Sequence, residues 1–267
     1  MNKKYEELLS YISEYEKIAI AFSGGVDSTF VAKAAYDALG SNALAITIDS
    51  PYIPEWELKE AKNLAKTIGI KHEILKISEI PEVIKNNPEN RCYLCKKEIF
   101  NQIISLAKNR DINKVFDGSN FDDTKDYRPG MVALKELKVK SPLLDLKWTK
   151  DMIRKASKQL GLETWDKPAY ACLLTRIPHG VTLINKDLRL IEKAEVYLMD
   201  KGFKSLRVRK HGNIARIEVA RDERYKLFDE KLLDDISFKL KKIGFKYVSF
   251  EAGGYKMGSL NKRDSNE

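Results

Sequence analysis

The sequence predicts an α/β protein with a doubly wound, mostly parallel sheet and a second, smaller α+β domain. In the first part of the chain, short apolar runs of strand length alternate with stretches of helical periodicity. This alternation is typical of βαβ units, whose helices cover both faces of a parallel sheet. The order changes after the "PHG" at 178–180, where a helix, two strands, a helix and a strand follow. We therefore expect one domain at 1–176 and another at 177–267.

Four main strands are expected in the first domain, and its first two expected helices end near Gly40 and at Gly69. The expected strands are 17–22 ("KIAIAF"), 43–49, 72–77 and 114–119, with a shorter one at 138–144 ("KVKSPLL"). The expected helices are 28–39, 54–69, 91–109, 127–137 and 149–160.

In the second domain, two strands flank the turn residues "HGN" and predict a hairpin. The elements expected there are a helix at 186–202, strands at 204–210 and 214–220, a long helix at 221–244 and a strand at 245–251. If 181–184 ("VTLI") also forms a strand, the order is βαββαβ. We expect the tail at 261–267 to be frayed.

Composition indicates a globular protein of the cytoplasm. Of the 267 residues, 43% are hydrophobic and 33% are charged, and no apolar run approaches the ~18 residues of a membrane span. The start, "MNKKYEELLSYISEYEK", lacks the apolar core of a signal peptide. The net charge of +9 suits an anionic partner such as nucleotide phosphates or RNA. Lysines spread over solvated helix faces would explain the charge equally well.

The strongest motif is "FSGGVDST" at 22–29, between the first strand and the first helix of the sheet. Helix N-terminal amides attract an anion, and Gly24 and Gly25 let the backbone approach phosphate oxygens. The hydroxyl donors are Ser23, Ser28 and Thr29. The motif is neither a Walker A loop nor GxGxxG. A plain turn with Ser and Asp as helix caps is the structural alternative.

This octapeptide resembles the pyrophosphate loop of the ATP pyrophosphatase (PP-loop) superfamily, which has a HUP-like fold. The resemblance implies an enzyme that cleaves ATP between the α- and β-phosphates, adenylates its substrate and releases pyrophosphate. It also implies nucleotide contacts near Asp49, after the second strand, and along "DGSNFDD" at 117–123. The implied ATP-binding residues are Ser23, Gly24, Gly25, Val26, Asp27, Ser28, Thr29, Asp49, Gly118, Ser119 and Asp122. Asp27, Asp122 and Asp123 are the candidates to carry Mg²⁺ on the phosphates.

The chain has three cysteines. Cys92 and Cys95 ("RCYLCKK") open an expected helix and lie one turn apart. Their basic neighbours and the helix N-terminus favour thiolate. The third, Cys172, lies in "AYACLLTRIPHG". An odd number of cysteines without an export signal argues against a disulfide framework.

Several kinds of cysteine site stay open on the residues alone. A structural zinc site needs four ligands, and the histidines show no paired spacing with the CxxC. A redox dithiol leaves Cys172 unexplained. Three thiolates on a [4Fe–4S] cluster leave one iron without a protein ligand, and that iron could bind an external sulfide. Three packed cysteines with no chemistry are the remaining alternative.

The stretch "PAYACLLTRIPHG" is similar to the cysteine-bearing loop of the LarE-type sulfur transferases, which make the nickel-pincer nucleotide cofactor. "LRVRKHGNIARIEV" at 206–219 and "GYKMGSLN" at 254–261 resemble the second domain of that family. The resemblance implies ATP-dependent conversion of a carboxylate of pyridinium-3,5-biscarboxylic acid mononucleotide to a thiocarboxylate. Some members sacrifice the cysteine that corresponds to Cys172, which becomes dehydroalanine. Others pair it with a CxxC and hold a [4Fe–4S] cluster, and Cys92, Cys95 and Cys172 match this second pattern.

The same resemblance implies roles for further residues. Arg207 and Arg209 would hold the substrate phosphate, for which guanidinium groups are suited. Arg176 would stabilise the acyl-adenylate, so that the implied catalytic residues are Cys172, Arg176 and Asp27. Glu195 and Glu218 would be polar or metal-coordinating residues of the substrate pocket. The first domain would then bind ATP and carry the cysteines, and the second would bind substrate and assemble a homo-oligomer.

Three alternative functions share the same loop. A tRNA thiolase also uses ATP and often a three-cysteine cluster, and its RNA would suit the basic charge. An amide-forming PP-loop synthetase such as an NAD synthetase needs no cysteine. A nucleotide-binding regulator would release no pyrophosphate. We expect a small-molecule substrate and no membrane partner, with tRNA kept as the alternative acceptor. The sulfur donor cannot be read from the residues.

Overall fold

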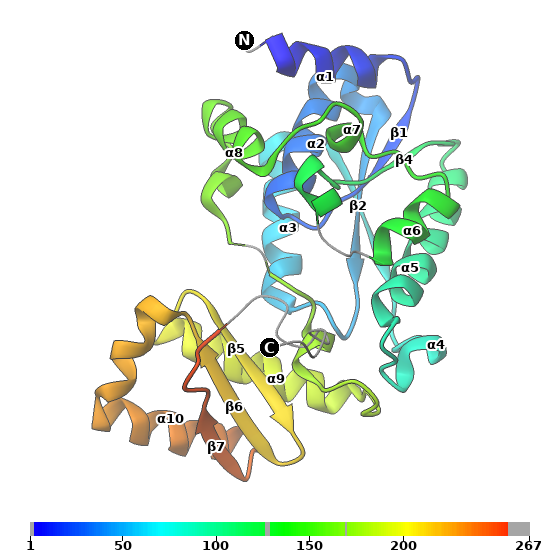
Figure 1. The fold of residues 1–267 in the computed structure, drawn as a ribbon. Helices are drawn as coiled ribbons and strands as arrows, with labels where there is room; N and C mark the ends of the chain where they lie inside the picture. The colour runs from blue at the N-terminus through cyan, green and yellow to red at the C-terminus, as the bar shows by residue number, and fades with distance from the viewer. Residues whose placement is uncertain (1–2, 126–128, 169, 256–267) are drawn as a thin grey trace. The chain divides into compact units, whose positions relative to one another are not determined.

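The computed structural model describes residues 3–125, 129–168 and 170–255 (Figure 1). By backbone contacts the chain forms two compact units, Met1–Val83 with Asn90–Tyr170, and Ile84–Glu89 with Ala171–Glu267. The side chain of Asn87 donates to the backbone carbonyls of Ile177 and Pro178 (3.1 and 2.7 Å), which holds 84–89 in the second unit. The domain boundary expected at 176/177, and the roles given to the two domains, stay predictions. The expected frayed tail lies outside the described residues.

The first unit contains a four-stranded parallel sheet in the order β3-β2-β1-β4 (Figure 1). The strands are β1 (Ile18–Ala21), β2 (Ala43–Asp49), β3 (Lys71–Lys76) and β4 (Val115–Phe116). Strands β2 and β3 are added on one side of β1, and β4 is added on the other. The chain therefore reverses direction across the sheet between β1 and β4, where α/β sheets of this kind bind ligands.

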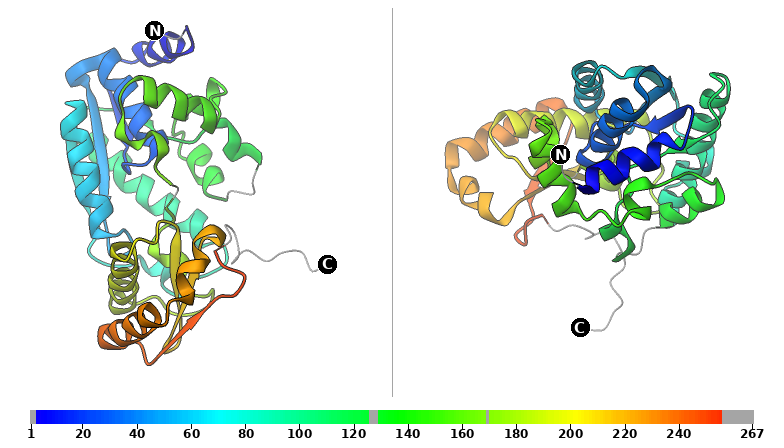
Figure 2. Two further views of the ribbon diagram at one scale, coloured as in Figure 1. Left: turned by 90° about the vertical axis from the view of Figure 1, so that its left-hand side faces the viewer. Right: turned by 90° about the horizontal axis from the view of Figure 1, so that it is seen from above.

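Helices cover both faces of this sheet, as Figures 1 and 2 show. Ile18 and Ile20 of β1 pack into a core with residues of α1, α2, α3 and α8, whereas Ala19 points to the opposite face, where α5 packs. Alternate residues of one strand are thus buried on two sides. The helices are α1 (Lys3–Ser13), α2 (Val26–Leu39), α3 (Glu55–Ile68), α5 (Arg91–Lys108), α6 (Pro129–Glu136), α7 (Pro142–Asp145) and α8 (Lys150–Gln159). The predicted doubly wound α/β class is confirmed.

The strand expected at 138–144 is wrong. Only one parallel bridge, between Phe116 and Lys140, is formed there, and Pro142–Asp145 is the short helix α7. Proline has no N–H to donate to a strand ladder, and its fixed φ suits the first turn of a helix. The apolar residues of this segment are buried by the helical turn and not by a fifth strand.

The second unit has a three-stranded sheet in the order β5-β6-β7. Its elements are α4 (Glu82–Lys85, of which the last two residues lie in this unit), α9 (Asn185–Asp200), β5 (Leu206–His211), β6 (Ile214–Val219), α10 (Glu230–Ile243) and β7 (Tyr247–Phe250). The predicted hairpin is present as the antiparallel pair β5/β6, and β7 joins β6 in parallel. Residues 181–184, all of which the structure describes, form no strand, so the order βαββαβ is wrong.

The long helix expected at 221–244 is divided. Arg221–Phe228 forms 3₁₀ turns, and α10 begins only at Glu230. Asp229 ends the first part and caps the second, since its carboxylate accepts from the amide of Leu232 at 3.2 Å. Aspartate in this position satisfies an amide that the helix itself cannot. The capping side chain, rather than a proline or glycine, makes the break.

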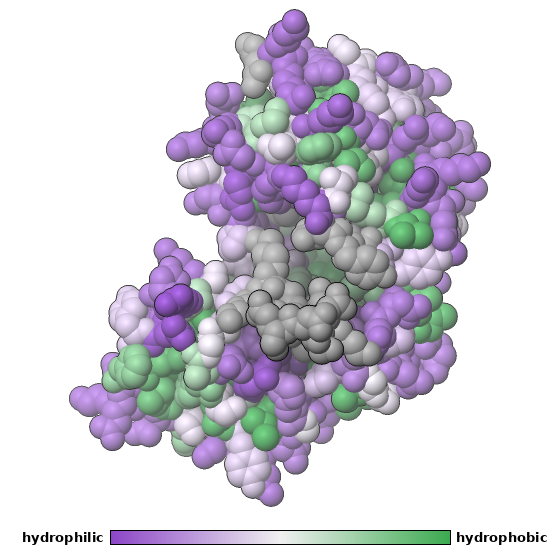
Figure 3. All heavy atoms as spheres, viewed as in Figure 1, coloured by the Kyte–Doolittle hydropathy of each residue, from purple (hydrophilic) through white to green (hydrophobic). Residues whose placement is uncertain are grey.

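The described part of the chain contains no helix that is long and apolar enough to cross a membrane. Hydrophilic side chains cover much of the face drawn in Figure 3, and hydrophobic side chains form smaller patches among them.

Replacing Asp229 with alanine should lower the free energy of unfolding by about 1 kcal/mol, the usual value of an N-cap. The loss follows because the Leu232 amide would no longer have the carboxylate as its acceptor. Urea unfolding followed by circular dichroism measures it. Asp229→Asn should retain most of the stability, and equal stability of the alanine variant would contradict the assigned cap.

Candidate active site

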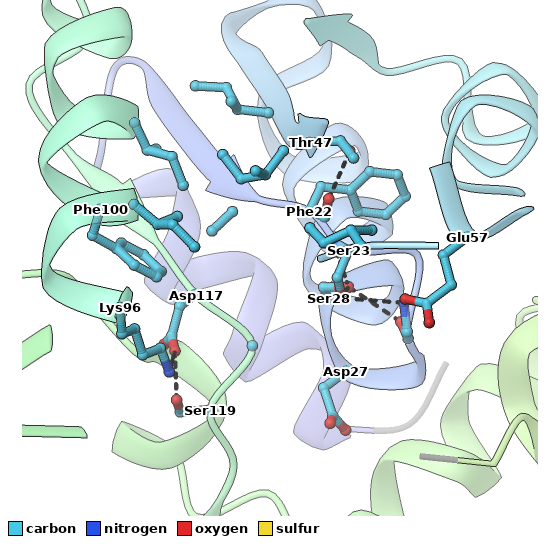
Figure 4. Close-up of a pocket in the computed structure, with 18 of the residues that line it drawn as sticks. Phe22, Ser23, Asp27, Ser28, Thr47, Glu57, Lys96, Phe100, Asp117 and Ser119 are labelled. Atoms are coloured by element: carbon cyan, nitrogen blue, oxygen red, sulfur yellow. Dashed lines mark hydrogen bonds and ion pairs between the residues drawn. The ribbon is translucent and has the colours of Figure 1, made fainter. Parts of the chain in front are cut away.

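A cavity of about 340 Å³ opens at the carboxyl ends of β1, β2 and β4 (Figure 4). Ser23 lines it from the loop that joins β1 to α2, and Ser28 from the first turn of α2. Lys96 and Phe100 line it from α5 on the other side. Phe22, Ile46, Thr47 and Ile48 add wall from the strand ends. The cavity thus lies at the switch point of the sheet and combines an apolar wall with a polar, glycine-containing loop.

The loop has the geometry of an anion seat. Gly25 caps α2, so the first amides of that helix face the loop. The Ser23 and Ser28 hydroxyls lie 3.1 Å apart, and Ser28 Oγ also accepts from the Ser23 amide at 3.3 Å. Gly24 has a φ of +69°, and a Cβ there would lie 3.2 Å from Ala61 of α3. Glycine is required at Gly24 for both the backbone angle and the close helix.

Asp27 lies at one end of the cavity and forms an ion pair with Lys150. Its Oδ2 is 2.6 Å from Lys150 Nζ. Burial raises the pKa of the Asp27 carboxyl above its ordinary value, and the Lys150 ammonium opposes this shift. Asp123 also lines the cavity. Two carboxylates beside an anion seat are the oxygen ligands that a phosphate-bound Mg²⁺ uses.

The segment after β4 forms the opposite wall. Asp117 accepts hydrogen bonds from Ser119 and, at 2.6 Å, from Ser141, and Lys96 Nζ lies 3.8 Å from its carboxylate. Between Asp117 and Ser119, Gly118 passes directly over the first turn of α2. A Cβ on Gly118 would lie 2.9 Å from the amide nitrogen of Ser28. The absence of a side chain therefore lets this segment touch the start of α2.

The predicted ATP-binding residues do not all line this cavity. Ser23, Gly25, Asp27, Ser28, Gly118 and Ser119 line it. Val26 and Thr29 are buried in α2, and Gly24 and Asp49 are not among the lining residues. Asp122 is also outside the lining, because its carboxylate accepts from the backbone amide of Lys150 and from Lys125. The role of each in binding stays a prediction.

Two lysines at the loop have no motif that identifies them in the sequence. Lys150 reaches Asp27 from the start of α8. Lys167 donates to the Gly24 carbonyl at 2.9 Å and to Glu60 at 2.8 Å. Both are far from the loop in the sequence, and no local pattern distinguishes them from the many other lysines of the chain. Only the tertiary structure brings them to it.

The second unit contains a buried cluster of charged side chains. Arg176, which is 2% exposed, forms a two-pronged ion pair with Glu195, with both N–O distances at 2.9 Å. The same guanidinium donates to the carbonyls of Ala171 and Cys172. Arg176 therefore holds the backbone around the cysteine. Stabilisation of an acyl-adenylate by Arg176 stays a prediction.

The predicted phosphate ligands belong to this cluster. Arg207 and Arg209 alternate on β5 and are each 5% exposed, and Glu218 and Arg216 lie opposite them on β6. Arg209 and Arg216 both bond to Glu218 Oε1. Glu218 Oε2 is buried and has no hydrogen-bond partner among the described residues.

Among the buried members, three arginines and two glutamates leave one positive charge (3 − 2): Arg176, Arg207 and Arg209 with Glu195 and Glu218. Arg216, whose side chain is 33% exposed, pairs with Glu218 and also with Glu251. Burial lowers the pKa of Arg207, with Arg176 adding to the effect. An excess of buried positive charge favours a bound anion.

The cysteines are placed on a helix start and a turn. Cys92 and Cys95 lie in the first turns of α5, and Cys172 directly precedes the 3₁₀ turn Leu173–Arg176. Cys92 is exposed and the other two are partly exposed, and no disulfide joins them. Within the described residues, no three or more His, Cys, Asp or Glu side chains form a group that could hold a metal ion.

Comparison with known proteins identifies the class. The family model of NAD synthase matches residues 2–109, a range that includes the glycine loop and the CxxC. Together with the parallel sheet and the anion seat at its switch point, this match defines an ATP-using enzyme of the PP-loop class.

Full-length relatives identify the family. A pyridinium-3,5-bisthiocarboxylic acid mononucleotide synthase of Lactiplantibacillus plantarum is 33% identical over 262 residues, 97% of this chain and 94% of that protein. An uncharacterized protein of Synechocystis sp. is 41% identical over 263 residues, 98% of each chain. One of Methanocaldococcus jannaschii is 37% identical over 233 residues, 87% of this chain and 88% of the relative. The chain belongs to the LarE family of PP-loop proteins.

Gly118→Ala should weaken ATP binding by about tenfold, the change that ~1.4 kcal/mol produces. The new Cβ would meet the Ser28 amide at 2.9 Å and displace the anion seat. Isothermal titration with ATP measures the effect. Gly253→Ala is the matched control, because Gly253, like Gly118, has no positive φ and a Cβ there would meet only Glu251 Oε1, at 3.4 Å. Equal ATP affinity of both variants would contradict the close approach.

Proposed function

We propose that this protein is an ATP-dependent sulfur transferase that acts on pyridinium-3,5-biscarboxylic acid mononucleotide. ATP would adenylate a carboxylate of the substrate, and sulfur would then displace AMP to give a thiocarboxylate. The observation that carries the proposal is the 94% coverage of the L. plantarum synthase, because a match of that extent includes both units and not the ATP-binding part alone.

The first unit supports the adenylation step. The substrate carboxylate attacks the α-phosphorus, and pyrophosphate leaves into the loop of Ser23–Ser28. Helix amides and hydroxyls there stabilise the charge that develops on the leaving group. Mg²⁺ on the phosphates would be held by Asp27 and Asp123, whose carboxylates line the cavity. Lys150 forms an ion pair with Asp27.

The second unit supports recognition of the mononucleotide. A phosphate monoester is an anion at neutral pH, and the buried arginines of the cluster outnumber its buried glutamates. Arg207 and Arg209 present guanidinium groups from one strand face. Glu195 and Glu218 orient the arginines, and the second oxygen of Glu218 is available to a ligand or a cation.

We further propose that Cys92, Cys95 and Cys172 hold a [4Fe–4S] cluster. The donor set fits such a group, because cluster iron is bound by thiolates and none of these cysteines is in a disulfide. The cluster would supply the sulfide, on the iron that no cysteine ligates. Arg176 fixes the backbone that carries the Cys172 thiol. In the sacrificial alternative, Cys172 itself gives up its sulfur.

The other readings have less support. A synthetase of the NAD type is favoured only by the family model, which ends at residue 109 and leaves the second unit unexplained. A tRNA acceptor is favoured only by the net charge of +9.

The sulfur acceptor tests the function. With ATP, Mg²⁺ and a sulfide source under anaerobic conditions, purified protein should form the thiocarboxylate of the mononucleotide together with AMP and pyrophosphate. Mass spectrometry follows the product, and bulk tRNA and deamido-NAD with ammonia serve as competing substrates. Thiolation of tRNA or formation of NAD in place of the thiocarboxylate would refute the proposal.

Iron analysis tests the cluster. Protein prepared without oxygen should be brown and bind about four irons per chain, and Cys92→Ser and Cys172→Ser should each lower the iron content sharply. The chain has no fourth cysteine whose replacement by serine could serve as a control. Ser105→Ala, on the same helix as Cys92, is therefore the matched variant. A colourless protein that converts Cys172 to dehydroalanine on turnover would support the sacrificial mechanism instead.

A further inference from the structure

The glycine loop is held from behind by one ammonium group. Lys167 Nζ donates to the Gly24 carbonyl at 2.9 Å and to Glu60 Oε2 at 2.8 Å. The Lys167 side chain is only 10% exposed, and its ammonium lies 5.9 Å from the ring centroid of Trp56. Neither Lys167 nor Gly24 is among the residues that line the cavity. Lys167 therefore acts on the loop and not directly on a ligand in the cavity.

Because Gly24 and Gly25 share one planar peptide, the contact that holds the Gly24 carbonyl also sets the direction of the Gly25 N–H. The Gly24–Gly25 peptide is trans, so its carbonyl and its N–H point in opposite directions. The carbonyl points to Lys167, and the Gly25 N–H points to Ser23 Oγ at 3.3 Å. Ser23 and Gly25 both line the cavity. Fixing the carbonyl thereby keeps the amide on the phosphate side.

A glycine pair needs such an anchor. Two adjacent glycines can adopt more backbone conformations than any other dipeptide, and most of these would turn the amide away. Helix α3 supports the loop with two neighbouring residues. Ala61 lies where a Cβ on Gly24 would be 3.2 Å away, and Glu60 holds the Lys167 ammonium. The loop peptide is therefore held by α3 and by the cation that α3 binds.

Lys167 is itself fixed by a second anchor. The guanidinium of Arg154, on α8, donates to the carbonyls of Trp165 and Lys167, each at 2.7 Å. The backbone of this segment is thus tied to α8, while its lysine side chain reaches the loop. Lys167 is thus fixed at its backbone carbonyl and at its ammonium group. A residue that orients another group needs such support.

We propose that Lys167 is a positioning residue for pyrophosphate: it orients the Gly24–Gly25 peptide so that the loop amide meets the β- and γ-phosphates of ATP. The proposal rests on the assignment of the loop as the pyrophosphate seat. AMP lacks the two phosphates that the loop receives. Lys167 therefore controls affinity for pyrophosphate and ATP and leaves affinity for AMP unchanged.

Isothermal titration of the full-length protein with Mg²⁺ and each of pyrophosphate, ATP and AMP tests this inference. Lys167→Met should weaken pyrophosphate and ATP binding by about tenfold, the loss expected for one charge-assisted hydrogen bond, and change AMP binding less than about twofold. Lys167→Arg, which keeps the charge, should recover most of the affinity. Lys155→Met is the matched control, since Lys155 pairs with Asp151 on the surface.

The outcomes separate this inference from the function on which it rests. Wild-type affinity for pyrophosphate in Lys167→Met, or an equal loss for pyrophosphate and AMP, would overturn the positioning role. A wild-type protein that binds neither ATP nor pyrophosphate would instead overturn the assignment of the loop. If Lys167→Met does not fold, Glu60→Gln decides: it should weaken pyrophosphate binding about threefold without affecting AMP, and wild-type affinity for both would overturn the inference.

Discussion

The close approach of three backbones at the carboxyl edge of the parallel sheet is the constraint on which the rest depends. The loop after β1 packs on α3 at Gly24, and the segment after β4 packs on the first turn of α2 at Gly118. A side chain at either glycine would separate the layers. Because they meet, the first amides of α2, two serine hydroxyls and two aspartates face one cavity. The anion seat is thus a consequence of packing as much as of the motif.

Acidic side chains around this seat form ion pairs with lysines. Lys150 pairs with Asp27, Lys167 with Glu60 and Lys96 with Asp117. Each pair places a lysine against an acidic group or a loop carbonyl. Buried or partly buried carboxylates need such partners, because desolvation penalises their charged form.

In the buried cluster of the second unit, the charges do not balance. Its arginines outnumber the glutamates that hold them, and nearly all are removed from solvent. Removing one partner of such a network would leave a buried charge uncompensated. An anionic ligand would balance the excess positive charge. The same network holds the Cys172 backbone through Arg176.

The sequence by itself determined the α/β class, the anion loop and the β5/β6 hairpin, since periodicity, paired glycines and alternation are local signals. It also placed Arg207 and Arg209 on one strand face. It misjudged 138–144, 181–184 and 221–244, where a proline, packing and an aspartate cap outweighed the apolar pattern. Lys150 and Lys167 were decided by the tertiary structure alone, because a lysine carries no signal of which distant carbonyl or carboxylate it will meet.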